Sequence, residues 1–142
     1  MKVKITRIDK DLPIPSYQTD GSVAFDLYAR VETVIEPKTL GFIPSNLIIQ
    51  TPEGYGLIVA ARSSTPKRLG LLIPHGFGLI DRDYAGENDE IVIQVYNFTD
   101  KAVTVPRGER IAQAFFIENE SVTFEETDPL DQSRGGYGST GK

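Results

Sequence analysis

The chain has 142 residues, of which 39% are hydrophobic and 25% charged, a composition typical of one globular domain with a hydrophobic core. It contains no Cys, which excludes disulfides and thiolate sites and suits a reducing cytoplasm. The net charge of −5 argues against a nucleic-acid-binding surface, and no apolar run reaches the length of a signal peptide or membrane span. We therefore expect a cytoplasmic protein that binds neither nucleic acid nor membranes.

Short apolar or alternating runs rich in Val, Ile, Phe and Tyr recur along the chain, and Pro and Gly separate them. This pattern predicts an all-β fold of many short strands, a sandwich or a barrel. The expected strands are residues 3–8, 23–27, 47–50, 57–61, 71–73, 91–96, 102–105, 111–117 and 122–124. A single helical turn is expected within 63–69, since Ser favours helix caps and Pro66 is tolerated in a first turn.

An acid interrupts the apolar run around Asp26, and a buried carboxylate requires a partner, most plausibly Arg. The partnership can be a structural ion pair or part of a site. Arg62, Ser63 and Ser64 follow an apolar run, where they can bind phosphate oxygens or simply end a strand with a capping Ser.

The segment from His75 to Glu87 predicts a hairpin. The apolar pair before Asp81 anchors a strand, and alternation places Asp81 and Asp83 on one face and Tyr84 on the other, before a tight turn at Gly86. A polar hairpin tip without chemistry is the alternative interpretation. His75 is the only His, so neither a zinc site nor a Ser-His-Asp triad is favoured, and a structural or lining role is expected.

Alternation in the run 111–117 places Ile111 and Gln113 on one face, so Gln113 is expected to be partly buried and bonded to a structural partner or a ligand. The composition changes after residue 130, and four of the last eight residues are Gly. Residues 1–130 are expected to form one β domain, and 131–142 a flexible C-terminal arm. The arm can be a disordered end, or it can fold over a ligand.

Five segments in order resemble the five motifs of the trimeric dUTP pyrophosphatases (dUTPases): VAFDLYA, ARSS, GFGLIDRDYAGE, VPRGERIAQ and RGGYGSTG. The resemblance spans residues 22–142. It implies a jelly-roll-like (β-clip) fold and a homotrimer with sites at subunit interfaces, over which the arm closes. It also implies hydrolysis of dUTP to dUMP and pyrophosphate, with Mg²⁺ held by the triphosphate and waters rather than by protein ligands. Such a reaction limits uracil in DNA and supplies dUMP for dTTP synthesis.

The same resemblance implies roles for individual residues. Asp81 would be the general base that activates water for attack on the α-phosphorus, because an ionised carboxylate can accept its proton. Asp26 and Asp83 would support the site. Phosphate would be bound by Arg62, Ser63, Ser64, Gln113, Arg134, Ser139 and Thr140, and base and sugar by His75, Gly78, Ile80, Tyr84 and Tyr137.

The chain departs from the family pattern at three places. Ala24 stands near the first-motif acid, where the family commonly has Gly. The segment 86–91 is longer than in many family members. In the arm, Gln132 occupies the usual position of the phosphate-binding Arg, and Arg134 stands directly before Gly135. Two rivals remain. A dCTP deaminase of the same fold would carry Glu where this chain has Gln94, and a non-catalytic nucleotide-binding module would bind dUTP without turnover.

Overall fold

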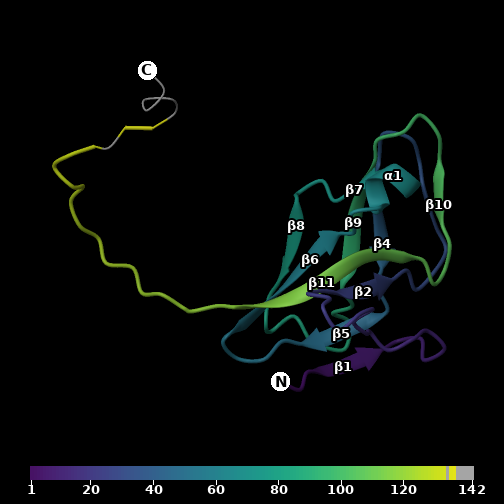
Figure 1. Cartoon of the computed structure of the whole chain (residues 1–142), viewed down its shortest axis with the longest axis horizontal. Helices are drawn as coiled ribbons and strands as arrows, with labels where there is room; N and C mark the ends of the chain where they lie inside the picture. The colour runs from purple at the N-terminus through teal and green to yellow at the C-terminus, as the bar shows by residue number, and fades with distance from the viewer. Residues whose placement is uncertain (134, 137–142) are drawn as a thin grey trace.

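The computed structural model describes residues 1–133, 135 and 136, and its regular structure is almost entirely β (Figure 1). The strands are β1 Lys4–Arg7, β2 Phe25–Tyr28, β3 Thr33–Ile35, β4 Leu40–Pro44, β5 Leu47–Gln50, β6 Tyr55–Ala61, β7 Leu71–Leu72, β8 Phe77–Ile80, β9 Val92–Asn97, β10 Val103–Val105 and β11 Arg110–Glu118. Helix α1, Thr65–Leu69, follows β6. The all-β prediction is confirmed.

The strands pair in four antiparallel sheets. The largest has the order β2-β11-β6-β8, and a second has the order β4-β9-β7, while β1 pairs with β5 and β10 with β3. Strands far apart in sequence are neighbours, as β2 and β11 are in Figure 1. Strand β8 is the edge of the four-stranded sheet, so one side of its main chain is free of sheet pairing.

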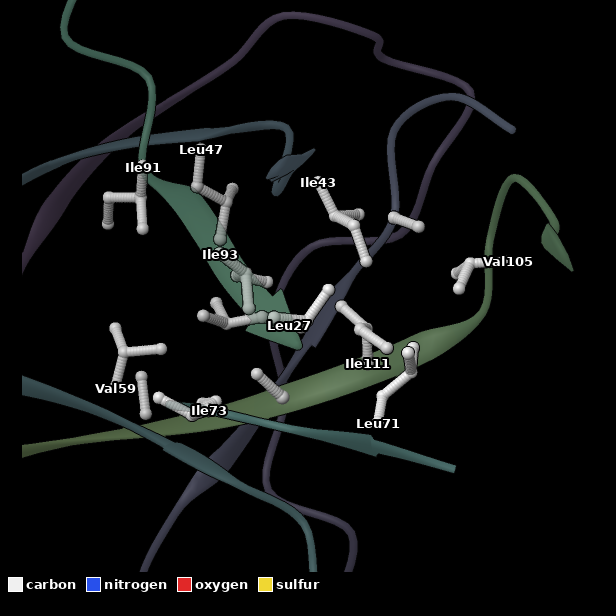
Figure 2. Close-up of a cluster of buried hydrophobic side chains, with 14 of the residues drawn as sticks. Leu27, Ile43, Leu47, Val59, Leu71, Ile73, Ile91, Ile93, Val105 and Ile111 are labelled. Carbon is white, nitrogen blue, oxygen red and sulfur yellow. The ribbon is translucent and has the colours of Figure 1, made fainter. Parts of the chain in front are cut away.

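Apolar side chains from these sheets meet in one core (Figure 2). Leu27 of β2 and Ile111 of β11 come from the four-stranded sheet, and Ile43 of β4 and Ile93 of β9 from the three-stranded one. All four are at most 2% exposed, and burying each such side chain contributes roughly 1.5–3 kcal/mol. The core therefore holds the two sheets in a fixed relation and sets the positions of the loops between them.

Helix α1 forms within the region where the sequence predicts a helical turn. Gly70 ends it in the left-handed conformation, with φ of 66°, and donates its N–H to the carbonyl of Pro66 at 3.0 Å. Ser64 stands at the N-cap but makes no side-chain cap hydrogen bond. The capping role expected for Ser is therefore wrong, and the Ser64 hydroxyl is not engaged by the helix.

The expected strands differ from the structure in three places. Strands β3 and β4 were not among the expected runs. The expected strand 122–124 does not form, and Val122 and Phe124 are 66% and 91% exposed. Figure 1 shows the chain leaving the body after β11 as an extended segment. A short strand needs a neighbouring strand to satisfy its main chain, and the described part of this chain offers none there.

Of the predicted C-terminal arm, residues 131–133, 135 and 136 are described and are exposed, whereas Arg134 and 137–142 lie outside the described residues. In the part of the chain that the structure describes, no helix has the length and apolar character of a membrane span.

Candidate functional site

The first polar cluster lies at one end of the four-stranded sheet, around the buried carboxylate of Asp26. Arg62 follows β6, and its Nε lies 2.8 Å from Asp26 Oδ1, while Arg110 Nη1 lies 3.2 Å from Asp26 Oδ2. Arg62 also donates from Nη1 to the main-chain oxygen of Arg110 at 3.3 Å. Asp26, expected to pair with one arginine, thus pairs with two. The two guanidiniums compensate the buried charge and are held side by side.

A β-bulge at the start of β11 brings Arg110 into this cluster. Gln113 pairs with Asp26 across the strands, but the register shifts between Arg110 and Ala112. The extra residue breaks the alternation of side chains. Consequently Ile111 packs in the core, and the expectation that Ile111 and Gln113 share a face is wrong. The sequence offers no local signal for this bulge, so Arg110 received no role there.

Gln113 is partly buried, as expected, and its partner within the chain is structural: Nε2 donates to the carbonyl of Ala61 at 3.0 Å. Ser63 is exposed and Ser64 is half-buried. An open cavity of about 660 Å³ adjoins the cluster and is lined by Gln18, Tyr28, Arg62, Ser64, Arg68, Gly108, Glu109 and Arg110. Arg68 forms an ion pair with Glu109 at this cavity. The positive groups and the hydroxyl of Ser64 make it suitable for an anion with several oxygens.

The predicted hairpin does not form, because β8 pairs with β6 and the next strand, β9, belongs to the three-stranded sheet. Strand β8 ends at Ile80, and the Tyr84 N–H donates to the carbonyl of Asp81 at 3.2 Å. Because the chain turns here, alternation does not apply, and the expectation that Asp81 and Asp83 share one strand face is wrong. The predicted tight turn at Gly86 does form, with the Asp89 N–H donating to the Gly86 carbonyl at 3.2 Å.

Asp81 and Asp83 are exposed along a groove of about 930 Å³. The groove lies between the turn after β8, the start of β6 and the segment after β11, and is also lined by Glu53, Arg82 and Glu120. Asp81 is therefore accessible to water and to a ligand approaching this face.

Three residues expected at the base, His75, Gly78 and Ile80, line one small cavity between β8 and β9, together with Gln94. Its volume of about 20 Å³ suits a single water, so a nucleobase does not fit inside it. A β-carbon on Gly78 would lie 3.7 Å from His75 Nε2, an ordinary contact. A base would have to lie against the free edge of β8 instead.

The two polar regions lie at opposite ends of the sheet. Ile80 pairs with Leu57, near the start of β6, whereas Arg62 follows the end of that strand. The distance along β6 from Leu57, the partner of Ile80, to Arg62 is roughly 16 Å at about 3.3 Å per residue. Within one chain the structure therefore does not bring Asp81 together with Arg62, Ser63 and Gln113.

A third set of contacts, which the sequence did not reveal, lies behind the turn that carries Tyr84. The Tyr84 hydroxyl donates to the carbonyl of Glu90 at 3.2 Å, and the Glu90 carboxylate accepts two hydrogen bonds from Arg30, each at 2.8 Å. These bonds raise the pKa of Arg30 above its ordinary value. Four expected site residues, Arg134, Tyr137, Ser139 and Thr140, lie outside the described residues.

Comparison with known proteins places this geometry in a family. The sequence profile of dUTPase matches residues 10–141. The deoxyuridine 5'-triphosphate nucleotidohydrolase of Dictyoglomus turgidum is 41% identical over 148 residues, covering 99% of each chain. The crystal structure of the dUTPase from Streptococcus mutans superposes with a TM-score of 0.77 at 27% identity, over 84% of this chain and 98% of that one.

Two phage proteins share the fold at lower identity. A mutant of the Staphylococcus bacteriophage 80alpha dUTPase with dUpNHpp has a TM-score of 0.84 at 19% identity, covering 99% of this chain and 98% of that one. A mutant dUTPase from phage phi11 of S. aureus, described with a structural Mg(II) ion, has a TM-score of 0.80 at 16% identity, covering 93% and 100%. The predicted jelly-roll-like fold is confirmed, and the chain belongs to the dUTPase family.

Proposed function

We propose that this chain hydrolyses dUTP to dUMP and pyrophosphate through attack of water on the α-phosphorus. The observation that carries the proposal is the arginine cluster around Asp26, beside an open cavity, in a chain of the dUTPase family. Guanidiniums bind phosphate oxygens through strong, charge-assisted hydrogen bonds. In the cytoplasm the reaction would limit uracil in DNA and supply dUMP for dTTP synthesis.

The triphosphate would bind at the cluster. Arg62 is already held in place by Asp26, so little side-chain entropy is lost when phosphate arrives. Ser63 and Ser64 would add hydroxyl donors, and Gln113 has a second amide N–H besides the one donated to Ala61. Arg134, Ser139 and Thr140 of the C-terminal arm would complete the phosphate contacts.

The nucleoside and the attacking water would bind at β8 and the turn after it. Asp81 is exposed and can orient a water and accept its proton, with Asp83 beside it in the groove. Uracil would lie along the free edge of β8, where main-chain groups of the segment from His75 to Ile80 can read its polar edge. Tyr84 would lie under the deoxyribose and leave no space for a 2′-hydroxyl, and Tyr137 of the arm would cover the base.

Mg²⁺ fits this arrangement through the triphosphate rather than through a protein cage. Within residues 1–133 and 135–136, no three Asp, Glu or His side chains gather to hold a metal ion. Mg²⁺ retains several waters and commonly binds substrate phosphates. When bound, it supplies positive charge that offsets the charge of the phosphate oxygens.

The complete site would require neighbouring copies in a homotrimer. Asp81 and Arg62 of one chain are separated by the length of β6, so the two cannot act on the same α-phosphorus. Exposed apolar side chains support assembly: Phe77 and Leu79 lie on β8, and Leu40 and Phe42 lie on β4. Three equivalent sites would then form where β8 and the following turn of one copy face the arginine cluster of another.

The two rival functions have weaker support. A deaminase needs a carboxylate near the base, and the residue at the cavity behind β8 is the amide Gln94. A non-catalytic module would not require a water-accessible carboxylate such as that of Asp81, because binding alone involves no proton transfer from water.

Pyrophosphate release with dUTP, dCTP, dTTP and UTP in the presence of Mg²⁺ tests the proposal. We expect selective hydrolysis of dUTP and a loss of about 100-fold or more in Asp81→Asn, as for removal of a general base. Asp100→Asn, in the turn after β9, is the matched control and should retain activity. Equal turnover of dTTP, or an unaffected Asp81→Asn, would contradict the proposal. Ammonia release from dCTP would favour the deaminase, and dUTP binding without turnover the non-catalytic module.

A further inference from the structure

Behind the turn that carries Tyr84, the Glu90 carboxylate pairs with the Arg30 guanidinium, and neither side chain has a place in the proposed substrate contacts. We propose that this pair is a positioning device: it fixes the ring of Tyr84 and thereby sets the discrimination between deoxyribose and ribose. The inference rests on the proposed function, in which Tyr84 lies under the sugar.

Tyr84 is held at both of its ends. Its main-chain N–H donates to the carbonyl of Asp81 at 3.2 Å, and its hydroxyl donates to the carbonyl of Glu90, also at 3.2 Å. Tyr84 is 39% exposed, so the side chains of residues 1–133 do not enclose it. The hydroxyl bond is therefore the contact that fixes the direction of an otherwise open ring.

The acceptor carbonyl is in turn fixed by the Glu90 side chain. Oε1 accepts from Arg30 Nε and from the Asn46 N–H, and Oε2 accepts from Arg30 Nη2, all at 2.8 Å. Arg30 is tied to the body by its own N–H, which donates to the carbonyl of Pro44 at 2.8 Å. The Glu90 and Arg30 side chains are only 14% and 28% exposed, which limits screening of the bidentate pair by solvent.

Asn46 connects the pair to a second segment of the chain. It has a positive φ of 72°, which directs its N–H toward Glu90, and its side chain exchanges hydrogen bonds with the main chain of Asp9 at 2.6 and 2.9 Å. Glu90 is thus anchored to the loop after β2 and to the turn between β4 and β5. Both are parts of the folded body rather than of the segment from Asp81 to Glu90.

The length of the turn explains why such an anchor is useful. Between Tyr84 and Glu90 the chain forms a separate small turn, in which the Gly86 N–H donates to Asp89 Oδ2 at 2.7 Å. A longer connection has more conformations to restrict. Without the Glu90–Arg30 pair the end of this turn could shift and carry the Tyr84 hydroxyl with it. The ring could then move aside and admit a ribose 2′-hydroxyl.

The ratio of kcat/KM for dUTP to that for UTP measures this effect. We expect the ratio to fall about fivefold to tenfold in Tyr84→Phe, as for the loss of one neutral hydrogen bond, and to a similar extent in Glu90→Ala and Arg30→Met. The change should arise from better use of UTP rather than from general loss of activity. Glu90→Gln keeps one acceptor oxygen and should give an intermediate ratio. This variant still tests the inference if Glu90→Ala does not fold. Asp100→Asn, which removes the exposed carboxylate partner of Lys38, should leave the ratio unchanged.

The double variant Tyr84→Phe/Glu90→Gln tests whether Glu90 acts by positioning the Tyr84 ring or only by stabilising the fold. If Glu90 acts through the Tyr84 hydroxyl, the ratio in the double variant should equal that in Tyr84→Phe. A ratio unchanged by Tyr84→Phe, or effects of the two substitutions that multiply, would overturn the inference.

Hydrogen exchange at residues 84–91 provides a readout independent of turnover. We expect Glu90→Gln to lower protection of these amides and Asp100→Asn to leave it unchanged. If the wild type does not turn over dUTP, the proposed function fails, and this measurement still tests the anchor. Unchanged protection in Glu90→Gln would overturn it.

Discussion

Asp26 is a buried carboxylate whose two oxygens each face an arginine, Arg62 at 2.8 Å and Arg110 at 3.2 Å. Burying such a charge is unfavourable unless it is paired, and removing one member leaves another charge without compensation. The cluster is therefore arranged before any ligand binds. As a result, the guanidinium of Arg62 is held in one orientation.

A second ion pair at the residue scale joins Asp9 to Arg107. Arg107 donates to Asp9 Oδ2 from Nε at 3.0 Å and from Nη2 at 2.6 Å, and this lowers the pKa of Asp9, with a further contribution from the Asp11 N–H. Because the pKa is lower in the folded state, the pair stabilises the fold above the unfolded value of about 3.9. That stabilisation is lost as the pH falls through the folded pKa.

We therefore predict that Arg107→Met lowers the melting temperature at pH 7, and that the difference from the wild type narrows below about pH 4, where Asp9 becomes protonated. Thermal unfolding of both proteins between pH 7 and pH 2.5 measures this. Lys38→Met, which breaks a pair with the exposed Asp100, is the control. A difference that stayed constant over this range would show that the Asp9 charge is not involved.

At the scale of elements, Asn97 joins the end of β9 to β3 and to the turn that leads into β10. The side chain is fully buried and all its groups are used: Nδ2 donates to the carbonyls of Ile35 and Lys101, and Oδ1 accepts from the N–H and the hydroxyl of Thr99. A polar side chain bonded in this way supports several main-chain groups that would otherwise be unpaired inside the protein.

Asn97→Leu keeps a similar size but removes these bonds, so we expect the free energy of unfolding to fall by about 2 kcal/mol or more. Urea unfolding measures the loss. Thr104→Val, at an exposed position of β10, is the control and should change the value by no more than about 0.5 kcal/mol. If Asn97→Leu were as stable as the control, water or rearranged groups would have to replace the Asn97 amide.

At the scale of the whole molecule, the length of β6 separates the turn after β8 from the arginine cluster. Assembly of copies would resolve this separation, because a neighbouring molecule can bring its Arg62 to the Asp81 of the first. Residues 119–133 also leave the body as an exposed segment (Figure 1). This segment carries Phe124 and Leu130, which are 91% and 90% exposed among the described residues.

This arrangement predicts complementation between two inactive variants. Asp81→Asn and Arg62→Met should each be inactive alone, but refolding them together should restore activity. In a ring of randomly mixed copies, a site with an intact Asp81 from one copy and an intact Arg62 from its neighbour forms in about a quarter of cases. Pyrophosphate release from dUTP after joint refolding measures this, and the same variants mixed without refolding are the control. If joint refolding restored nothing, Asp81 and Arg62 would have to act from the same chain.

Much of the fold and part of the site follow from local sequence. The apolar runs before Arg62 and Asp81 place both residues directly after strands, and β6 and β8 do end at Ala61 and Ile80. Strand β4 was missed because it includes Gly41 and Pro44, which weaken a local strand signal, and β3 was missed because it has only three residues. Pairing with β9 and β10, which are distant in the sequence, stabilises these strands.

The sequence alone determined the fold class, the family and the order of the polar segments, because hydrophobic pattern, turn residues and motifs depend on neighbours a few positions away. Only the tertiary structure decided which side chains meet. The bulge in β11 directs Arg110 toward Asp26, the turn after Ile80 separates Asp81 from Asp83, and pairing of β6 with β8 places Asp81 far from Arg62. These features depend on partners distant in the chain, and no local pattern encodes them.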